Sequence, residues 1–389
     1  MSTNNQDLSK TAVSRRIDLL DAYRAIAIIW VAIYHYTYFW ASAGKGDNVL
    51  PYDVALAWIP LAGVGHLGVM LFFLISGYVI SLTLTKTANF PEFCVKRFAR
   101  IWPTLLVCGT ITFACASLFG PPELKRSIWE AMISMTLIPP SHVGALTGNP
   151  DWQWLDGAYW SLWVEVKFYA VIGAIFFAFR KRWFEAWLAF QALTMAITVG
   201  LVATSNAVLD LAEGLLFAQY VPYFTVGILA YRFRNGTSTR TDLVALVFAI
   251  THKTLSIATS EANLTLSMLT GYAIIFGLFA IFIWRPNLLN FMTHKLFLRI
   301  GRASYSFYLL HQVAGISLLV LIAALFGTTA SIMALPLVFA LLIFVSFQIF
   351  EHIEQPTNRW LVSTYKNWRG ANGIGVRSQT REHSTEQTD

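Results

Sequence analysis

The stretch from Asp18 to Trp40 constrains the fold of this 389-residue chain more than any other. From Leu19 onward it is apolar and aromatic, and its length suits a membrane-crossing helix, which needs about 20 residues. Yet it contains Arg24 and His35, and ionisable side chains within a membrane usually face a protein interior or a wet cavity. Eleven residues at about 100° each put both side chains on one helix face, about 16 Å apart along the axis. The stretch therefore predicts one polar stripe across most of a membrane.

The composition indicates a protein built from many such helices. Hydrophobic residues make up 56% of the chain and charged residues only 13%, whereas a soluble domain carries roughly 25% charged residues. We therefore expect an all-α, polytopic membrane bundle with about ten transmembrane helices. The apolar segments are 19–40, 66–84, 101–119, 160–179, 183–204, 211–231, 242–258, 265–284, 303–326 and 332–351. The three cysteines give no zinc-site spacing, and we expect no metal.

The distribution of Lys and Arg predicts the topology. With the N-terminus inside, 22 of these residues fall in inner segments, 3 in outer segments and 3 within spans. Because cytoplasmic loops are rich in Lys and Arg, both termini are expected to be cytoplasmic. We divide the chain into a cytoplasmic N-terminal tail (1–18), a transmembrane domain (19–360) and a polar cytoplasmic tail (361–389), and we expect the last to be disordered.

Two arginines stand at the inner end of the third apolar segment, in the sequence KRFARIWP. Arg97 and Arg100 are three residues apart, so on a helix they project from one side and can hold phosphates through forked hydrogen bonds. The simpler interpretation is anchoring, since cytoplasmic helix ends favour basic residues in any case.

An acid and an imidazole are expected at similar depth in the bundle. Glu165 and His35 each lie about five residues inside the outer edge of their segments, which is roughly 7 to 8 Å deep. They can form an orienting pair with His35 as the base. In the competing interpretation, Glu165 pairs with the neighbouring Lys167 or reaches outward.

The ninth segment and the long outer loop contain further candidate functional residues. Ser304 and His311 are seven residues apart on one helix face, and His311 lies about 12 Å from the inner edge. It either lines the same passage from the cytoplasmic side or hydrogen-bonds to a neighbour. The loop 120–159 and the start of the next segment bring together Trp152, Trp154, Tyr159 and Trp160. These aromatic residues form either an interfacial belt or a stacking surface for a sugar.

Taken together, these stretches resemble the membrane-bound acyltransferase family 3. LDAYRAIAIIWVAIYH is similar to that family's signature of Arg, ten residues and His, and FFLISGYVIS is similar to its second-span pattern. RFAR, WSLWVEVKFY and SYSFYLLH are similar to its Arg-x-x-Arg, Trp-Ser-Leu-x-Val-Glu and Ser-Tyr-Ser-x-Tyr-Leu-x-His elements. The five motifs occur in order between about Leu19 and Trp360. One departure is Lys167, where the family often has Gln.

The resemblance implies a multi-pass O-acyltransferase of the bacterial cytoplasmic membrane. Such an enzyme moves an acyl group, usually acetyl, from cytoplasmic acyl-CoA to a hydroxyl of a cell-envelope or exported carbohydrate, including a lipid-linked saccharide. Acetyl-CoA is then a donor substrate, and no cofactor is bound permanently. Membrane lipids are the other expected partners, and nucleic acid is not expected.

The resemblance and the positions above suggest roles for individual residues. We expect His35 and Glu165 to be catalytic, with His35 acting as a base or as a nucleophile that forms an acyl-enzyme. The residues expected to bind acyl-CoA are Arg24, Arg97, Arg100 and His311. Other polar residues expected to line the cavity are Ser76, Tyr78, Ser161, Ser304 and Tyr308. The hypothesis requires that Arg24 and His35 border one continuous, water-accessible passage.

Two other functions are compatible with parts of the sequence. A small-molecule transporter or exporter would also have many spans with buried polar residues, although the paired broken helices and inverted halves of many transporters are not evident. A scaffold for polysaccharide machinery is the third possibility. The sequence also does not distinguish among the possible acceptors, which are O-antigen, exopolysaccharide, peptidoglycan, a lipid-linked sugar and a secondary metabolite.

Overall fold

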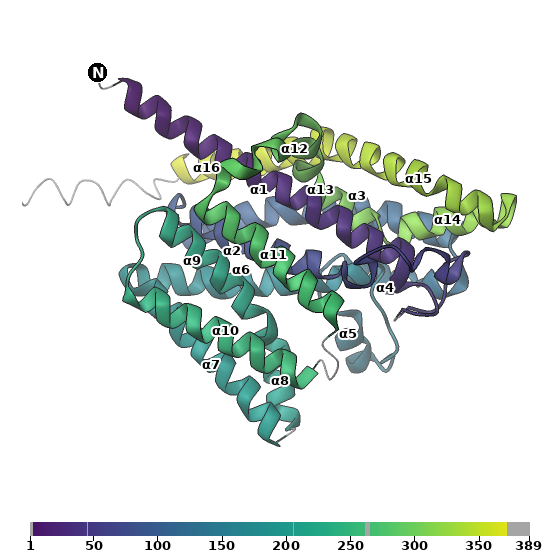
Figure 1. Ribbon diagram of the computed structural model, residues 1–389, viewed down its shortest axis with the longest axis horizontal. Coiled ribbons are helices and arrows are strands. Elements are labelled where there is room, and N and C mark those ends of the chain that lie inside the picture. Colours follow the sequence, from purple (N-terminus) through teal and green to yellow (C-terminus); the bar gives the residue numbers. More distant parts are fainter. Residues whose placement is uncertain (1–2, 45, 205, 261–264, 372–389) are drawn as a thin grey trace, which may run out of the picture.

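The computed structural model describes residues 3–44, 46–204, 206–260 and 265–371, apart from the side chains of residues 3–17 and 258–260. Within these ranges every regular element is a helix, which confirms the all-α fold class (Figure 1). The longer helices are α1 (Thr3–Tyr34), α2 (Leu67–Thr85), α3 (Phe90–Phe119), α6 (Trp160–Phe179), α7 (Trp183–Thr204), α9 (Val221–Arg234), α10 (Arg240–Ser260), α11 (Leu266–Trp284), α14 (Val313–Phe326), α15 (Thr328–Ile349) and α16 (Gln355–Ala371). The shorter ones are α4 (Ile128–Ser134), α5 (Pro140–Thr147), α8 (Ala207–Leu215), α12 (Lys295–Arg302) and α13 (Ser304–Leu310).

Each of the ten expected apolar segments coincides with helix, but fewer of them pass as membrane spans. In the described chain, five helical stretches are long and apolar enough to cross a membrane, or up to seven if each of two bent pairs is one span. One reason is that α6 and α7 form a single stretch, 157–204, across a short turn. Another is that Asp18, Asp21 and Arg24 interrupt the apolar part of α1.

The expected tails are partly helical. Helix α1 begins at Thr3, so it includes most of the N-terminal segment, and its first turns project from the bundle (Figure 1). At the other end, α16 continues to Ala371, so the expectation of disorder from residue 361 is wrong for residues 361–371. Residues 372–389 lie outside the described part of the chain.

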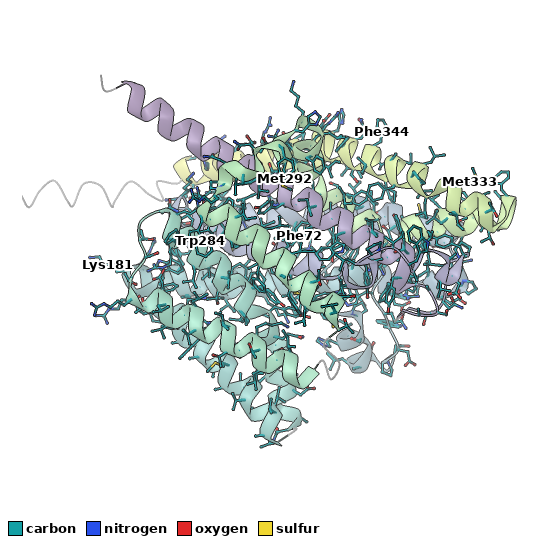
Figure 2. All side chains as sticks on the ribbon, viewed as in Figure 1. Phe72, Lys181, Trp284, Met292, Met333 and Phe344 are labelled. Carbon is teal, nitrogen blue, oxygen red and sulfur yellow. The ribbon has the colours of Figure 1, made fainter. Side chains whose placement is uncertain are left out.

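Helix α2 is the centre of the bundle. It packs against α1, α6, α9 and α11, while α3 packs against α13, α14 and α16. Helices α7 and α10 lie side by side at the lower left of Figure 1, where α7 also packs against α6 and α10 against α9. Side chains fill the space between the helices, and Phe72 on α2 is seen near the middle of the bundle, whereas Lys181 extends from its edge (Figure 2).

Two glycines allow α2 and α9 to approach closely. A Cβ atom at Gly77 would lie 2.3 Å from the carbonyl oxygen of Phe224, and one at Gly227 would lie 2.2 Å from that of Leu74. Both contacts are with backbone, which cannot turn aside as a flexible side chain can. Small residues at such crossings are a common feature of membrane helix pairs.

We expect Gly77→Ala to destabilise the protein by about 1 to 3 kcal/mol, because the added methyl group overpacks a backbone contact. The measurement is the thermal midpoint of the purified protein in detergent. Gly277→Ala in α11 is the matched control, since a Cβ there meets nothing within 4 Å. It should leave the midpoint unchanged or raise it, because Ala is favoured over Gly in a helix by about 0.5 to 1 kcal/mol. An equal fall in both variants would contradict the close-packing explanation.

The ninth expected span is broken. Helices α13 and α14 meet at an angle of 51° across residues 311–312, and backbone groups released inside a membrane protein need other partners. The hydroxyl of Tyr36 donates to the carbonyl of His311 (2.5 Å), and a carboxylate oxygen of Asp156 accepts from the N–H of Val313 (3.0 Å). The apolar pattern of 303–326 gives no sign of this break.

Asp156 is fully buried and precedes the candidate span that begins at Gly157. Its second carboxylate oxygen accepts from the N–H of Ala158 (2.9 Å). Burial raises the pKa of Asp156 to about 7, although the two N–H donors and Arg126 favour its ionised form. The side chain therefore links the outer-loop segment to the start of α14 and titrates near neutral pH.

This raised pKa predicts that stability falls as pH rises. Below about pH 4 the folded and unfolded states are both protonated, and between about pH 4 and 7 the unfolded state loses its proton first, so the folded state becomes less favoured. At about 1.36 kcal/mol per pKa unit, the full loss is about 4 kcal/mol. Thermal midpoints measured from pH 4.5 to 8 should decline less in Asp156→Asn than in the wild type. Parallel curves for the two proteins would contradict the prediction.

Candidate functional site

The first of two cavities contains most of the predicted basic residues, and we call it the Arg cavity. Its volume is about 350 Å³. Its wall comes mainly from α1, α2, α3, α6 and α13. The polar residues of the wall are Asp21, Arg24, Ser76, Arg97, Arg100, Ser161, Glu165, Tyr169, Arg302, Ser304, Tyr305 and Tyr308. Four of these residues are arginines and two are carboxylates, so the wall offers several guanidinium groups to an anionic ligand.

The second cavity, which we call the His cavity, has a volume of about 520 Å³. Its wall is largely aromatic and includes two imidazoles. The residues of interest are Tyr34, His35, Phe39, Trp40, Asp47, His66, Arg126, Trp152, Gln153, Trp154, Trp160 and Gln312. Apolar rings with a few polar groups are the usual lining of a small-molecule site.

The two cavities meet at a common wall formed by Val69 and Tyr308. The Tyr308 hydroxyl donates to the carbonyl of Ala158 (2.9 Å) and lies 2.7 Å from Ser161 Oγ. The edge of Phe72 packs against the same ring. Arg24 and His35 therefore line different cavities, and the single continuous passage expected from the sequence is divided in two.

Three of the four arginines in the Arg cavity have acidic partners. Arg24 pairs with Asp21 (2.8 Å), and Arg302 pairs with Asp18 and Asp21 at 3.2 and 3.3 Å. Arg100 forms an ion pair with Glu354.

Arg97 differs from these three. Among the described residues it has no carboxylate at ion-pair distance. Its guanidinium lies over the rings of Phe93 and Tyr169, at 5.8 and 5.5 Å from their centroids, and its buried Nε atom has no hydrogen-bond partner. Arg97 is therefore the cation of this wall best placed to bind an anion.

Glu165 belongs to the Arg cavity and not to the surroundings of His35. Its carboxylate accepts hydrogen bonds from Ser76 Oγ (2.6 Å) and from the hydroxyl of Tyr169. Lys167 points elsewhere, since its Nζ donates to the carbonyl of Gly214 (2.5 Å). The expected pair of Glu165 and His35 is thus wrong, because equal depth along two helices does not fix the side each residue faces. The competing interpretation, a pairing of Glu165 with Lys167, is not seen among the described residues either.

The partner of His35 is His311. His35 Nδ1 lies 3.0 Å from the carbonyl oxygen of Val31 and 3.1 Å from His311 Nε2, while His311 Nδ1 lies 2.7 Å from the carbonyl oxygen of Tyr308. A carbonyl oxygen only accepts, so in neutral rings each Nδ1 carries the hydrogen and each Nε2 keeps a lone pair. His311 Nε2 therefore accepts from His35 Nδ1–H. This arrangement leaves His35 Nε2 as the basic nitrogen of a side chain that lines the His cavity.

Each of the two π-helical segments in the described chain contains a residue that lies in or beside one of the two cavities. The first, His35–Phe39, continues α1, and the second, Phe350–Glu354, joins α15 to α16. A π-turn changes the direction of the side chains that follow, and such turns are frequent at functional sites. Here they contribute the imidazole of His35 and the buried carboxylate of Glu354, which pairs with Arg100.

The tryptophans of the loop 120–159 are held against the His cavity by polar contacts. Glu130, at the start of α4, accepts from the backbone N–H of Gln153 (2.9 Å), and Arg126 donates to the carbonyl of Trp154 (3.1 Å). These bonds fix the segment that carries Trp152 and Trp154. Of the two interpretations of these aromatic residues, a wall facing a ligand matches their position better than a belt facing lipid.

Three predicted residues lie outside both cavities, and one of them is Tyr159 of the expected stacking surface, which is fully buried and donates to the carbonyl of Leu309 (3.4 Å). Tyr78 packs its ring against Tyr231 and Phe282, and His311 is fully buried beside His35. The expected cavity-lining role of Tyr78 and the donor-side position of His311 are therefore corrected. The other predicted residues do line a cavity: Arg24, Ser76, Arg97, Arg100, Ser161, Glu165, Ser304 and Tyr308 in the Arg cavity, and His35 and Tyr308 in the His cavity.

Several wall residues were not foreseen from the sequence. Asp21 lies three residues before Arg24, and Tyr169 lies four residues after Glu165. Side chains at these spacings are neighbours on a helix, so that spacing is a usable signal. Arg302, His66, Trp40 and Gln312 carry no comparable signal, because tertiary packing alone brings them to the cavities.

Comparison with known proteins gives consistent matches. The family model described as "Acyltransferase domain", of the acyltransferase 3 type, matches residues 17–351. The peptidoglycan O-acetyltransferase OatA of Listeria monocytogenes is 27% identical over 244 residues, which are 59% of this chain and 33% of the relative. An O-acetyl transferase of Shigella phage Sf6 is 25% identical over 157 residues, 39% of this chain and 44% of the relative.

A third relative, the acyltransferase MdmB of Streptomyces mycarofaciens, is 27% identical over 110 residues, 26% of this chain and 28% of the relative. The chain thus spans less than half the length of each of these relatives. No solved structure matches it significantly.

Proposed function

Because the chain belongs to the acyltransferase 3 family and is a multi-pass membrane acyltransferase, we propose that it transfers an acetyl group from acetyl-CoA to a hydroxyl of a cell-envelope or exported carbohydrate. We place it in a bacterial cytoplasmic membrane with both termini on the cytoplasmic side, as its Lys and Arg distribution favours. Membership of an acyltransferase family argues against the alternatives of an exporter and a scaffold.

The observation that carries this proposal is the pair of cavities that meet at Tyr308. One is cationic and the other is aromatic and contains an imidazole base. The phosphates of acetyl-CoA match the cavity lined by arginines. The rings and hydroxyl groups of a sugar acceptor match the cavity lined by aromatic side chains and an imidazole. Since Val69 and Tyr308 separate the two cavities, transfer requires these two side chains to move aside, so that the thioester in one cavity meets the acceptor hydroxyl in the other.

On the donor side, the Arg cavity is suited to the anionic end and the pantetheine arm of acetyl-CoA. Arg97 has a guanidinium without an acidic partner among the described residues, and arginine binds phosphate through a planar fork. Arg24 and Arg100 contribute positive potential, while their own carboxylates hold them in place. The thioester would then point toward Tyr308.

On the acceptor side, His35 Nε2 takes the proton of the acceptor hydroxyl. The hydroxyl oxygen attacks the thioester carbonyl, the carbon–sulfur bond breaks, and the proton held by His35 passes to the departing thiolate of CoA. His311 keeps the His35 ring in the required tautomer by accepting its Nδ1–H (3.1 Å). Attack by His35 Nε2 itself, which gives an acetyl-histidine that the acceptor then deacylates, uses the same atoms.

The acceptor class rests on the relatives and on the His cavity. One relative is a peptidoglycan O-acetyltransferase, and tryptophan rings such as those of Trp152 and Trp154 are suited to stacking on sugar rings. A carbohydrate, free or lipid-linked, is therefore the acceptor we propose.

The test is label transfer by the full chain reconstituted in sealed proteoliposomes. Radiolabelled acetyl-CoA is supplied on one face and candidate glycans on the other, and labelled glycan is the expected product. Acetyl-CoA on the face carrying the loop 120–159 should be inactive. Absence of transfer with every acyl-CoA and glycan, together with uptake of a solute, would reject the proposal in favour of transport.

A further inference from the structure

The wall of the His cavity contains buried polar atoms that have no hydrogen-bond partner among the described residues. Those that carry the inference are Nε1 of Trp40, a donor, and Oε1 of Gln312, an acceptor. Trp40 is 7% exposed and Gln312 is 2% exposed, so bulk water does not replace the missing partners. A buried polar group without a partner destabilises the fold, which suggests that these atoms serve a ligand.

The positions of the two side chains are set by the elements around them. Trp40 follows the π-helical segment that begins at His35, and Gln312 follows His311 at the break between α13 and α14. Each is therefore tied through the backbone to one member of the pair His35–His311. A ligand held by both atoms would lie beside His35, in the cavity where its basic nitrogen is available.

The chemistry of the wall narrows the ligand to a neutral one. A donor and an acceptor together match hydroxyl groups, which can accept from one and donate to the other. Arg126 already gives its N–H groups to the carbonyls of Glu123, Lys125 and Trp154 and to the amide of Gln153. The other formally charged wall residue is Asp47, whose carboxylate would repel an anion.

We propose that Trp40 and Gln312 form the hydroxyl-binding subsite of the acceptor, and that it selects a neutral sugar unit over an anionic one. This inference rests on the function proposed above. The surrounding rings of Trp152, Trp154 and Trp160 supply the stacking surface, and the two polar atoms fix the orientation of the sugar. They recognise the acceptor and do not take part in bond breaking.

Binding is tested without turnover, by saturation-transfer NMR on the full chain in nanodiscs. The probes are neutral methyl glycosides of glucose, galactose, mannose and N-acetylglucosamine, with methyl glucuronide as the anionic counterpart. At least one neutral glycoside should bind, and more tightly than the glucuronide. Trp40→Phe and Gln312→Leu should each weaken this binding about 3- to 10-fold, the usual worth of a neutral hydrogen bond. Their thermal midpoints should stay unchanged or rise, because each removes an unpartnered polar atom.

Trp58→Phe is the matched control, since Trp58 is 75% exposed and lines neither cavity; its binding should equal that of the wild type. The inference is overturned if no neutral glycoside binds, if both subsite variants bind like the wild type, or if weaker binding only follows a lowered midpoint. A wild type that binds a glycoside yet transfers no acetyl group would reject the proposed function and leave the subsite standing.

Discussion

Replacing His35 by alanine is expected to reduce acetyl transfer about 10²- to 10⁴-fold, the usual contribution of a positioned general base. The effect should appear in kcat, because the proton transfer belongs to the chemical step. Acetyl-CoA binding should change little, because the donor residues lie in the Arg cavity, across the wall formed by Val69 and Tyr308. The measurement is steady-state transfer of label to a glycan acceptor, with donor affinity determined separately by equilibrium binding.

The control for this prediction is His352→Ala. His352 is exposed and lines neither cavity, so its variant should keep wild-type activity. His35→Gln, which fills more of the space, checks that a loss of activity in His35→Ala does not come from a collapsed cavity. If either His35 variant folds and retains full activity, His35 is not the base.

The second large effect is expected at Arg97. Arg97→Gln should raise the KM for acetyl-CoA about 10- to 100-fold, because a hydrogen bond to a charged group is worth about 1.5 to 3 kcal/mol. The thermal midpoint should fall less than in Arg100→Gln, since Arg97 loses its contacts with the rings of Phe93 and Tyr169 but no ion pair with a described residue. This split between donor affinity and stability is what distinguishes a ligand-binding arginine from a structural one.

Arg100 supplies the contrast on the same helix. Its partner Glu354 is 1% exposed, so Arg100→Gln leaves a buried carboxylate without its cation, a change that typically destabilises by about 3 to 5 kcal/mol. The exposed arginine of the Arg299–Glu351 pair is the neutral control, and Arg299→Gln should alter neither KM nor midpoint. An unchanged KM in Arg97→Gln would show that the phosphates bind elsewhere.

Much of the helical architecture could be read from the sequence, because apolar length and basic flanks report directly on membrane helices. The break at residues 311–312 could not be predicted from the sequence. The segment contains no Pro, and the break at the polar residues His311 and Gln312 is stabilised by Tyr36 and Asp156, which lie far away in the chain. Gly315 is part of the same arrangement, since a Cβ at that position would lie 2.1 Å from the Tyr36 hydroxyl oxygen.

Helix periodicity predicted which residues point into the bundle. It did not predict which of these residues contact each other. Arg24 and His35 both line cavities, but side chains from α2 and α13 fill the space between them. Glu165 and His35 are at similar depths in their helices and yet belong to different cavities. Lys167 could have been set aside on geometry alone, because residues two apart on a helix do not face each other.

The wall at Val69 and Tyr308 has a consequence for the electrical integrity of the membrane. The hydrogen-bonded ring of Tyr308 and the apolar side chain of Val69 lie between the Arg cavity and the His cavity, so no column of water connects the two through this wall. In the proposed transfer of an acetyl group, this wall would limit the leak of ions across the membrane between turnovers.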